Sequence, residues 1–203
     1  MNRLAVMLTV LALPAWPKSA MSEPPAPRNI RVASSQQAAD AIADDIIGGL
    51  WRLTDAHFHK GEYNHIINLC KMIIAARPDL LDAYADAAWL LWSMDRDDEA
   101  VALYKAGLRA NPHTSYMYDE LGTYYLMRKK DYRQAIHYYE EARRFKDYHP
   151  FMLHSLAHAY EKSGDLPKAL AVWQEAARNP KDVAAKVNIE RLKRLMAQPQ
   201  PNH

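Results

Sequence analysis

The feature that most constrains this chain is a pattern of small, aromatic and proline residues that recurs about every 34 residues. Pro112 follows Pro78 by 34 residues, and Pro180 closes a further segment of the same kind. The clearest copy runs from Phe151 to Ala176, with Gly164 near its middle. Two short helices meeting at Gly164 would place large side chains in the gap between them and small ones where the backbones approach closely. The pattern therefore predicts stacked helix-turn-helix units.

These residues resemble the tetratricopeptide repeat, in about four units from Ile47 to Pro180. The residues at matching positions are Ile66, Cys70 and Ile73 in the first unit, Tyr84, Ala88, Ala100, Tyr104 and Gly107 in the second, Tyr118, Leu121, Gly122, Tyr125, Ala135, Tyr139 and Ala142 in the third, and Leu156, Ala157, Tyr160, Ala169, Trp173 and Ala176 in the fourth. Two units depart from the pattern. Asp95 stands where the family usually has glycine, and the third unit has one extra residue around Lys129–Asp131 and no closing proline at Asp147.

The resemblance implies an all-α fold, a right-handed α-α superhelix with a C-terminal capping helix. It also implies a non-enzymatic scaffold that holds a peptide or a partner protein, although a fold does not name its ligand. Composition agrees with the fold class, because the chain has only 6 glycines and no alternating β-branched run.

Charge excludes one class of partner. The formal net charge is +2. Without Arg3 and Lys18 the chain would have 24 basic and 24 acidic residues and a formal net charge of zero. A neutral chain gives no reason to expect nucleic acid. The charge is unevenly placed, however, because Asp79–Glu99 contains seven acidic residues and one basic residue, Arg96.

The N-terminal 22 residues have the pattern of an export signal. Arg3 precedes the apolar run Leu4–Leu13, which is too short to span a bilayer, and Ala20–Ser22 offers small residues for cleavage. We therefore expect residues 1–22 to be a signal peptide and the protein to be periplasmic or secreted. If Met21 is the true start, the protein would instead be cytoplasmic.

The remaining chain divides into three parts. Residues 23–34 are rich in proline and predict a disordered linker. Residues 35–197 form the repeat domain with N- and C-terminal capping helices, and residues 198–203 are expected to be a disordered tail. Ser34 or Ser35 can cap the first helix, and Gly48–Gly49 predicts a kink and close helix packing there.

A concave groove is the expected binding surface, because the first helix of each repeat normally lines it in this family. Phasing the helices predicts an exposed groove that is acidic, aromatic and histidine-bearing. The predicted partner-binding residues are Trp51, Asp55, Asp86, Trp89, Asp119, Glu120, Thr123, His154 and His158. The carboxylate-clamp subgroup of the family uses lysines and asparagines at such places, and neither is present here. We therefore expect a basic or amphipathic segment as partner. The alternative is a solvated, charged face without a partner.

A metal-binding protein or metal-dependent enzyme is the rival hypothesis. His154 and His158 are spaced i, i+4 on one helix face, and Asp119 could be a third ligand. A second histidine cluster contains His57, His59 and His65, but alternation along the helix separates the first two, so a shared metal is expected less there. No H-E-x-x-H arrangement supports a metalloprotease, and we predict no cofactor.

Nucleophilic catalysis finds no support in the sequence. Ser155 lies between histidines, but adjacent residues on a helix do not face each other. There is no G-x-S-x-G motif and no glycine-rich phosphate loop. The single cysteine, Cys70, is expected to be a buried thiol. We therefore predict that the protein is not an enzyme.

Overall fold

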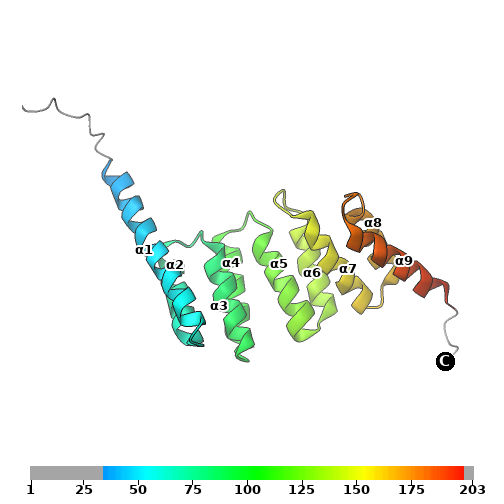
Figure 1. Ribbon diagram of the computed structural model, residues 1–203, viewed down its shortest axis with the longest axis horizontal. Helices are drawn as coiled ribbons and strands as arrows, with labels where there is room; N and C mark the ends of the chain where they lie inside the picture. Colours follow the sequence, from blue (N-terminus) through cyan, green and yellow to red (C-terminus); the bar gives the residue numbers. More distant parts are fainter. Residues whose placement is uncertain (1–33, 199–203) are drawn as a thin grey trace, which may run out of the picture.

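The computed structural model describes residues 34–198, and every regular element in that range is a helix (Figure 1). The predicted signal peptide at 1–22 and nearly all of the predicted linker and tail lie outside the described residues. The elements are α1 (Ser35–Phe58), α2 (Tyr63–Ala76), α3 (Leu81–Ser93), α4 (Asp97–Ala110), α5 (Tyr116–Thr123), η2 (Tyr124–Lys129), α6 (Tyr132–Ala142), η3 (Pro150–Met152), α7 (Leu153–Lys162), α8 (Leu166–Ala176) and α9 (Val183–Ala197).

The helices form a linear array in chain order, with α1 at one end and α9 at the other (Figure 1). Helices α1 and α2, α3 and α4, α5 and α6, and α7 and α8 pack as pairs, and each pair packs on the next. This arrangement confirms the predicted all-α superhelix of four repeats with a capping helix. Within residues 34–198, no helix combines the length and hydropathy needed to cross a membrane.

Each pair of helices is joined through one residue in the left-handed backbone conformation. These residues are Gly61, Asp95, Lys130 and Gly164, with φ of 71°, 61°, 53° and 88°. The recurrence explains the departure at Asp95, because aspartate adopts this conformation more readily than most residues with a side chain. The repeat therefore requires the backbone geometry at this turn and not the glycine itself.

The extra residue of the third repeat is accommodated by the π-helix η2. In three repeats, a backbone hydrogen bond that closes the turn spans five residues: Glu62 N to His57 O, Arg96 N to Leu91 O, and Asp165 N to Tyr160 O. In the third repeat the corresponding bond, Asp131 N to Tyr125 O, spans six residues. A π-bulge inserts one residue into a helix without breaking it. The insertion thus changes η2 and leaves the neighbouring helices in register.

The core consists of buried alanine, leucine and aromatic side chains between the helices. Gly122 and Gly107 permit the closest approaches: a Cβ added at Gly122 would come 2.6 Å from Tyr139 Cε1, and one at Gly107 would come 2.7 Å from Met117 Sδ. Ala157 is fully buried, as its position in the repeat predicts. Cys70 is also buried, and burial raises the pKa of its thiol to about 12. The thiol is therefore an apolar packing group.

The N-terminal helix differs from the prediction. Ser34 caps α1 through a capping box: its Oγ accepts a hydrogen bond from Gln37 N (3.2 Å), and Gln37 Oε1 accepts one from Ser34 N (2.9 Å). Helix α1 runs without interruption through Gly48–Gly49, so the segment expected to cap the array and the first helix of the first repeat are one helix. The expected close helix packing is also absent in the described structure, since a Cβ at either glycine would meet only Arg52 of α1 itself.

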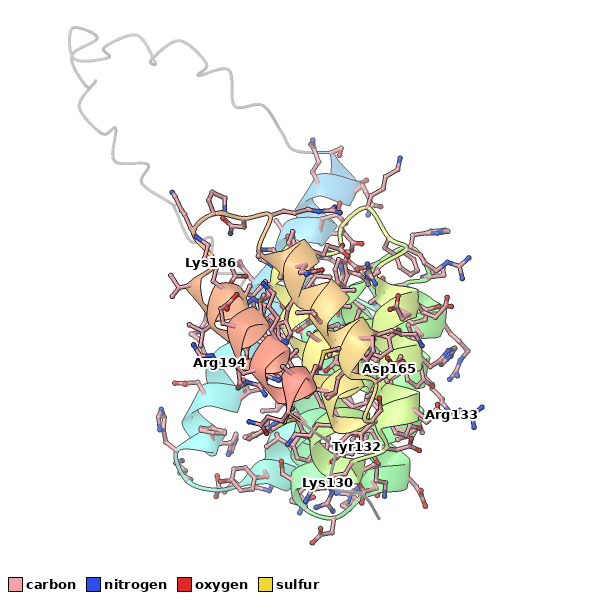
Figure 2. All side chains as sticks on the ribbon, turned by 90° about the vertical axis from the view of Figure 1, so that its right-hand side faces the viewer. Lys130, Tyr132, Arg133, Asp165, Lys186 and Arg194 are labelled. Atoms are coloured by element: carbon pink, nitrogen blue, oxygen red, sulfur yellow. The ribbon has the colours of Figure 1, made fainter. Side chains whose placement is uncertain are left out.

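Helix α9 covers the C-terminal end of the array, where Lys186 and Arg194 lie on the outer helix in Figure 2. Ala185 and Leu192 are fully buried against the last repeat, and Ile189 packs beside them. Met196 was expected on this inner face but is 41% exposed, because it lies beyond the last buried turn. The helix therefore acts as the predicted cap over most of its length.

Candidate partner-binding groove

The first two repeats enclose a hollow of about 270 Å³ between α1 and α3. It brings together three of the predicted partner-binding residues, Asp55 from α1 and Asp86 and Trp89 from α3. Three apolar lining residues, Phe58, Ile66 and Leu90, were not among the predicted partner-binding residues. The full lining is Thr54, Asp55, Phe58, Ile66, Asp86, Trp89 and Leu90. The hollow is therefore apolar at its walls with two carboxylates at its mouth.

Trp89 is partly exposed to solvent and packs against Trp92, which is held in the core. Its side chain is 47% exposed and meets the Trp92 ring edge-on at a centroid distance of 6.0 Å. Trp92 is half-buried and donates its indole N–H to Tyr104 Oη at 3.3 Å. Trp51 is half-buried against the same core. The hydrogen bond fixes Trp92, so the Trp89 ring has a firm support and one open face.

Four carboxylates lie on the two neighbouring helices α3 and α5. They are Asp82 and Asp86 on α3, and Asp119 and Glu120 on α5. Within residues 34–198, none of these four forms an ion pair, whereas many acidic residues elsewhere do, for example Asp97 with Arg128. The negative charge of the three that reach solvent, Asp82, Asp86 and Glu120, is therefore not neutralised by a neighbouring basic side chain.

Burial and the repulsion of neighbouring charges raise the pKa values of two of these groups, Asp86 and Glu120. Burial raises the pKa of Glu120 to about 7, with the charges of Asp119 and Asp86 adding to the effect. Partial desolvation also raises the pKa of Asp86, although the residue is exposed, and the charge of Asp82 adds to the effect. A cation placed among these groups would favour their charged forms and would be favoured by them. The surface should therefore attract a positively charged ligand.

Asp119 lies deeper than expected. The sequence predicted an exposed residue, but Asp119 is only 7% exposed, and its Oδ1 has no hydrogen-bond partner among the described residues. Burial raises the pKa of this carboxyl to about 6. A buried carboxylate without a partner is costly, so Asp119 destabilises the fold when it is ionised.

Thr123 contributes to the packing between α5 and α6. Its Oγ1 lies 3.0 Å from Tyr139 Oη, and Tyr139 is fully buried. The Thr123 hydroxyl thus has a hydrogen-bond partner inside the third repeat. Sequence phasing could place Thr123 on α5 but could not reveal this contact.

The two histidines of the fourth repeat pack on one tryptophan. Ring centroids lie 4.9 Å (His154) and 5.0 Å (His158) from that of Trp173. His154 Nε2 also lies 2.6 Å from Asp182 Oδ2, and Asp182 caps α9 by accepting from Ala185 N. Burial lowers the pKa of His158. His154 therefore links α7 to the start of α9 and has a structural partner.

The predicted metal ligands do not converge. Among the described residues, the only three histidine, cysteine or carboxylate side chains whose ligand atoms lie within 4.8 Å of one another are elsewhere, at the first interhelical turn. Asp119 is buried in the third repeat, and His154 is engaged with Asp182. The geometry of residues 34–198 therefore does not support a site made of Asp119, His154 and His158.

Comparison with known proteins identifies the repeat directly. A family described as "Tetratricopeptide repeat" matches residues 81–114, which contain α3 and α4. The solved structure of MamA is similar, with a TM-score of 0.58 and 17% identity over 70% of this chain and 84% of MamA. PilF of Pseudomonas aeruginosa has a TM-score of 0.62 and 14% identity over 76% of this chain and 70% of PilF. Residues 81–114 therefore match the tetratricopeptide repeat, and the described part of the chain shares the fold of these solved structures.

A curated relative extends over part of the chain. Protein FlbA of Caulobacter vibrioides is 31% identical over 105 residues, which is 52% of this chain. The matched region spans only 17% of the length of FlbA. The similarity therefore concerns a stretch of repeats and not the whole of FlbA.

Proposed function

We propose that this protein is a non-enzymatic scaffold that binds a basic or amphipathic protein segment along the surface formed by α1, α3 and α5. Repeat proteins of this fold present an extended surface suited to protein partners. The observation that carries the proposal is the group of three carboxylates that reach solvent on α3 and α5, Asp82, Asp86 and Glu120, which have no ion-pair partner within residues 34–198.

The chemistry of the surface favours one kind of segment. Lysine or arginine side chains would pair with Asp86 and Glu120, whose repulsion they would relieve. An apolar side chain on the same segment would fill the hollow beside Trp89. An arginine could also stack on the open Trp89 ring. An acidic segment would meet only repulsion, so the surface selects by charge as well as by shape.

Two synthetic peptides test the proposal. One alternates arginine and leucine, and its matched control replaces each arginine with glutamate. We expect the basic peptide to bind and to alter the fluorescence of the protein, and the acidic peptide not to bind. A pull-down from the native compartment would then identify the natural partner. Equal binding of both peptides, or of neither, would contradict the proposed surface.

We further propose that the protein is exported. The support is the sequence pattern of Arg3 followed by the apolar run Leu4–Leu13 and the small residues Ala20–Ser22. A partner would then be met outside the cytoplasm.

A further inference from the structure

Three potential metal ligands meet at the turn between α1 and α2. They are His57 in the last turn of α1, Glu62 just before α2, and His65 in the first turn of α2. One ligand atom from each lies within 4.8 Å of the other two. The cluster is separate from the histidines of the fourth repeat, and the groove proposed above does not include it.

The backbone of the turn holds the three residues together. Glu62 N donates to His57 O at 3.1 Å, and His65 N donates to Glu62 O at 3.0 Å. Gly61 makes the turn possible with a φ of 71°. Glu62 is the N-cap of α2, yet its side chain makes no capping hydrogen bond. Its carboxylate is thus free to face His57.

The side chains are already close to a coordinating arrangement. His57 Nδ1 lies 2.6 Å from Glu62 Oε2, and the His57 and His65 rings meet edge-on with centroids 5.0 Å apart. Ligands at about 2.1 Å from a tetrahedral zinc ion are roughly 3.4 Å from each other. Small side-chain rotations would lengthen the 2.6 Å contact between His57 Nδ1 and Glu62 Oε2 and bring the ring of His65 closer to both.

A hydrogen bond between His57 and Glu62 alone does not explain why His65 lies beside them. Within residues 34–198 the ring nitrogens of His65 form no hydrogen bond, although the ring lies against His57. His59 does not belong to the cluster, because it is directed to Asp55, with Nε2 3.6 Å from Oδ1. An ion held jointly by His57, Glu62 and His65 would use all three side chains.

We propose that His57, Glu62 and His65 bind a divalent transition-metal ion of the zinc class. Two imidazole nitrogens and one carboxylate oxygen are ligands that suit zinc, and the fourth position would be left to water. Calcium and magnesium prefer sites made of oxygen ligands, so they are disfavoured here. The ion would join the end of α1 to the start of α2 and stabilise the first repeat.

The test uses the full chain without an affinity tag, freed of metal by chelator and then dialysed. Zinc chloride is titrated by calorimetry, and melting temperature is measured with and without zinc. We expect one equivalent to bind and to raise the melting temperature. His65→Ala, Glu62→Gln and His57→Ala should each weaken binding at least ~10-fold, because each removes a ligand.

His59→Ala is the matched control, since it removes a neighbouring exposed histidine that is not in the cluster. It should bind zinc as the unaltered protein does. His65 is also exposed, so its variant should fold normally, and circular dichroism would verify this. Absence of zinc binding in the unaltered protein would overturn the proposal. Binding that survives His65→Ala, or that is lost in His59→Ala, would overturn it equally.

Discussion

Gly122 of α5 lies directly against the ring of Tyr139 of α6, so that a methyl group at Gly122 would come within 2.6 Å of the ring. Tyr139 is fully buried and its hydroxyl lies 3.0 Å from Thr123 Oγ1. The ring therefore cannot move aside without losing this contact. We predict that Gly122→Ala destabilises the protein by about 1–3 kcal/mol, as overpacking does. Urea unfolding measures the change, and an unchanged midpoint would show that α5 and α6 can separate freely.

Substitution by alanine should change the stability in opposite directions at Gly164 and at Gly48. At Gly164 the left-handed backbone, with a φ of 88°, is unfavourable for alanine. Gly164→Ala should therefore cost roughly 1 kcal/mol. At Gly48, inside α1, an added Cβ meets only Arg52 at 3.6 Å. Gly48→Ala should stabilise by about 1 kcal/mol, because alanine is the better helix former. Thermal unfolding of the two variants would test both, and equal shifts would contradict the assignment.

Asp119 should make the stability depend on pH. Its pKa is raised from 3.8 to about 6, so between these values the native state keeps a proton that the unfolded chain has released. The stability that protonated Asp119 contributes to the native state is fully present below pH 3.8 and is lost as pH rises through about 6. Asp119→Asn should therefore be more stable than the unaltered protein above pH 6, by up to about 3 kcal/mol. Urea midpoints across this range measure it, and parallel pH profiles for the two proteins would contradict it.

Charge reversal at the groove should slow the association of the basic peptide. Asp86 is exposed at the mouth of the hollow, so Asp86→Lys leaves the fold intact and opposes an incoming cation. Raised salt should slow association with the unaltered protein in the same way. The control is Asp98→Lys, an equal charge change on α4 outside the hollow. Stopped-flow kinetics separates them, and identical rates for both variants would place binding elsewhere.

Export predicts a particular mature N-terminus. If residues 1–22 are a signal peptide, the protein isolated from its native host should begin near Glu23. Intact-mass measurement of the fractionated protein decides this. A cytosolic protein that retains Met1, or begins at Met21, would contradict the proposal.

The sequence by itself determined the repeat architecture. Helix periodicity and the return of proline and small residues every 34 positions are local properties, so they can be counted without knowing which helices touch. The buried positions of Gly122, Ala157 and Cys70 follow from this phasing. The extra residue near Lys129 was visible too, but its accommodation as a π-helix needed the backbone hydrogen bonds of the structure.

Only the tertiary structure decided what each groove residue touches. Phasing assigns a residue to a helix face, but burial depends on side chains from distant segments. Asp119 was expected in solvent and is buried, while His154 pairs with Asp182, which lies 28 residues away in the chain. His57 and His65, grouped from the sequence with His59, meet because the chain reverses at Gly61, and only the structure shows that Glu62 joins them in place of His59. Periodicity reports the local direction of a side chain, whereas its partners are set by the packing of one helix on the next.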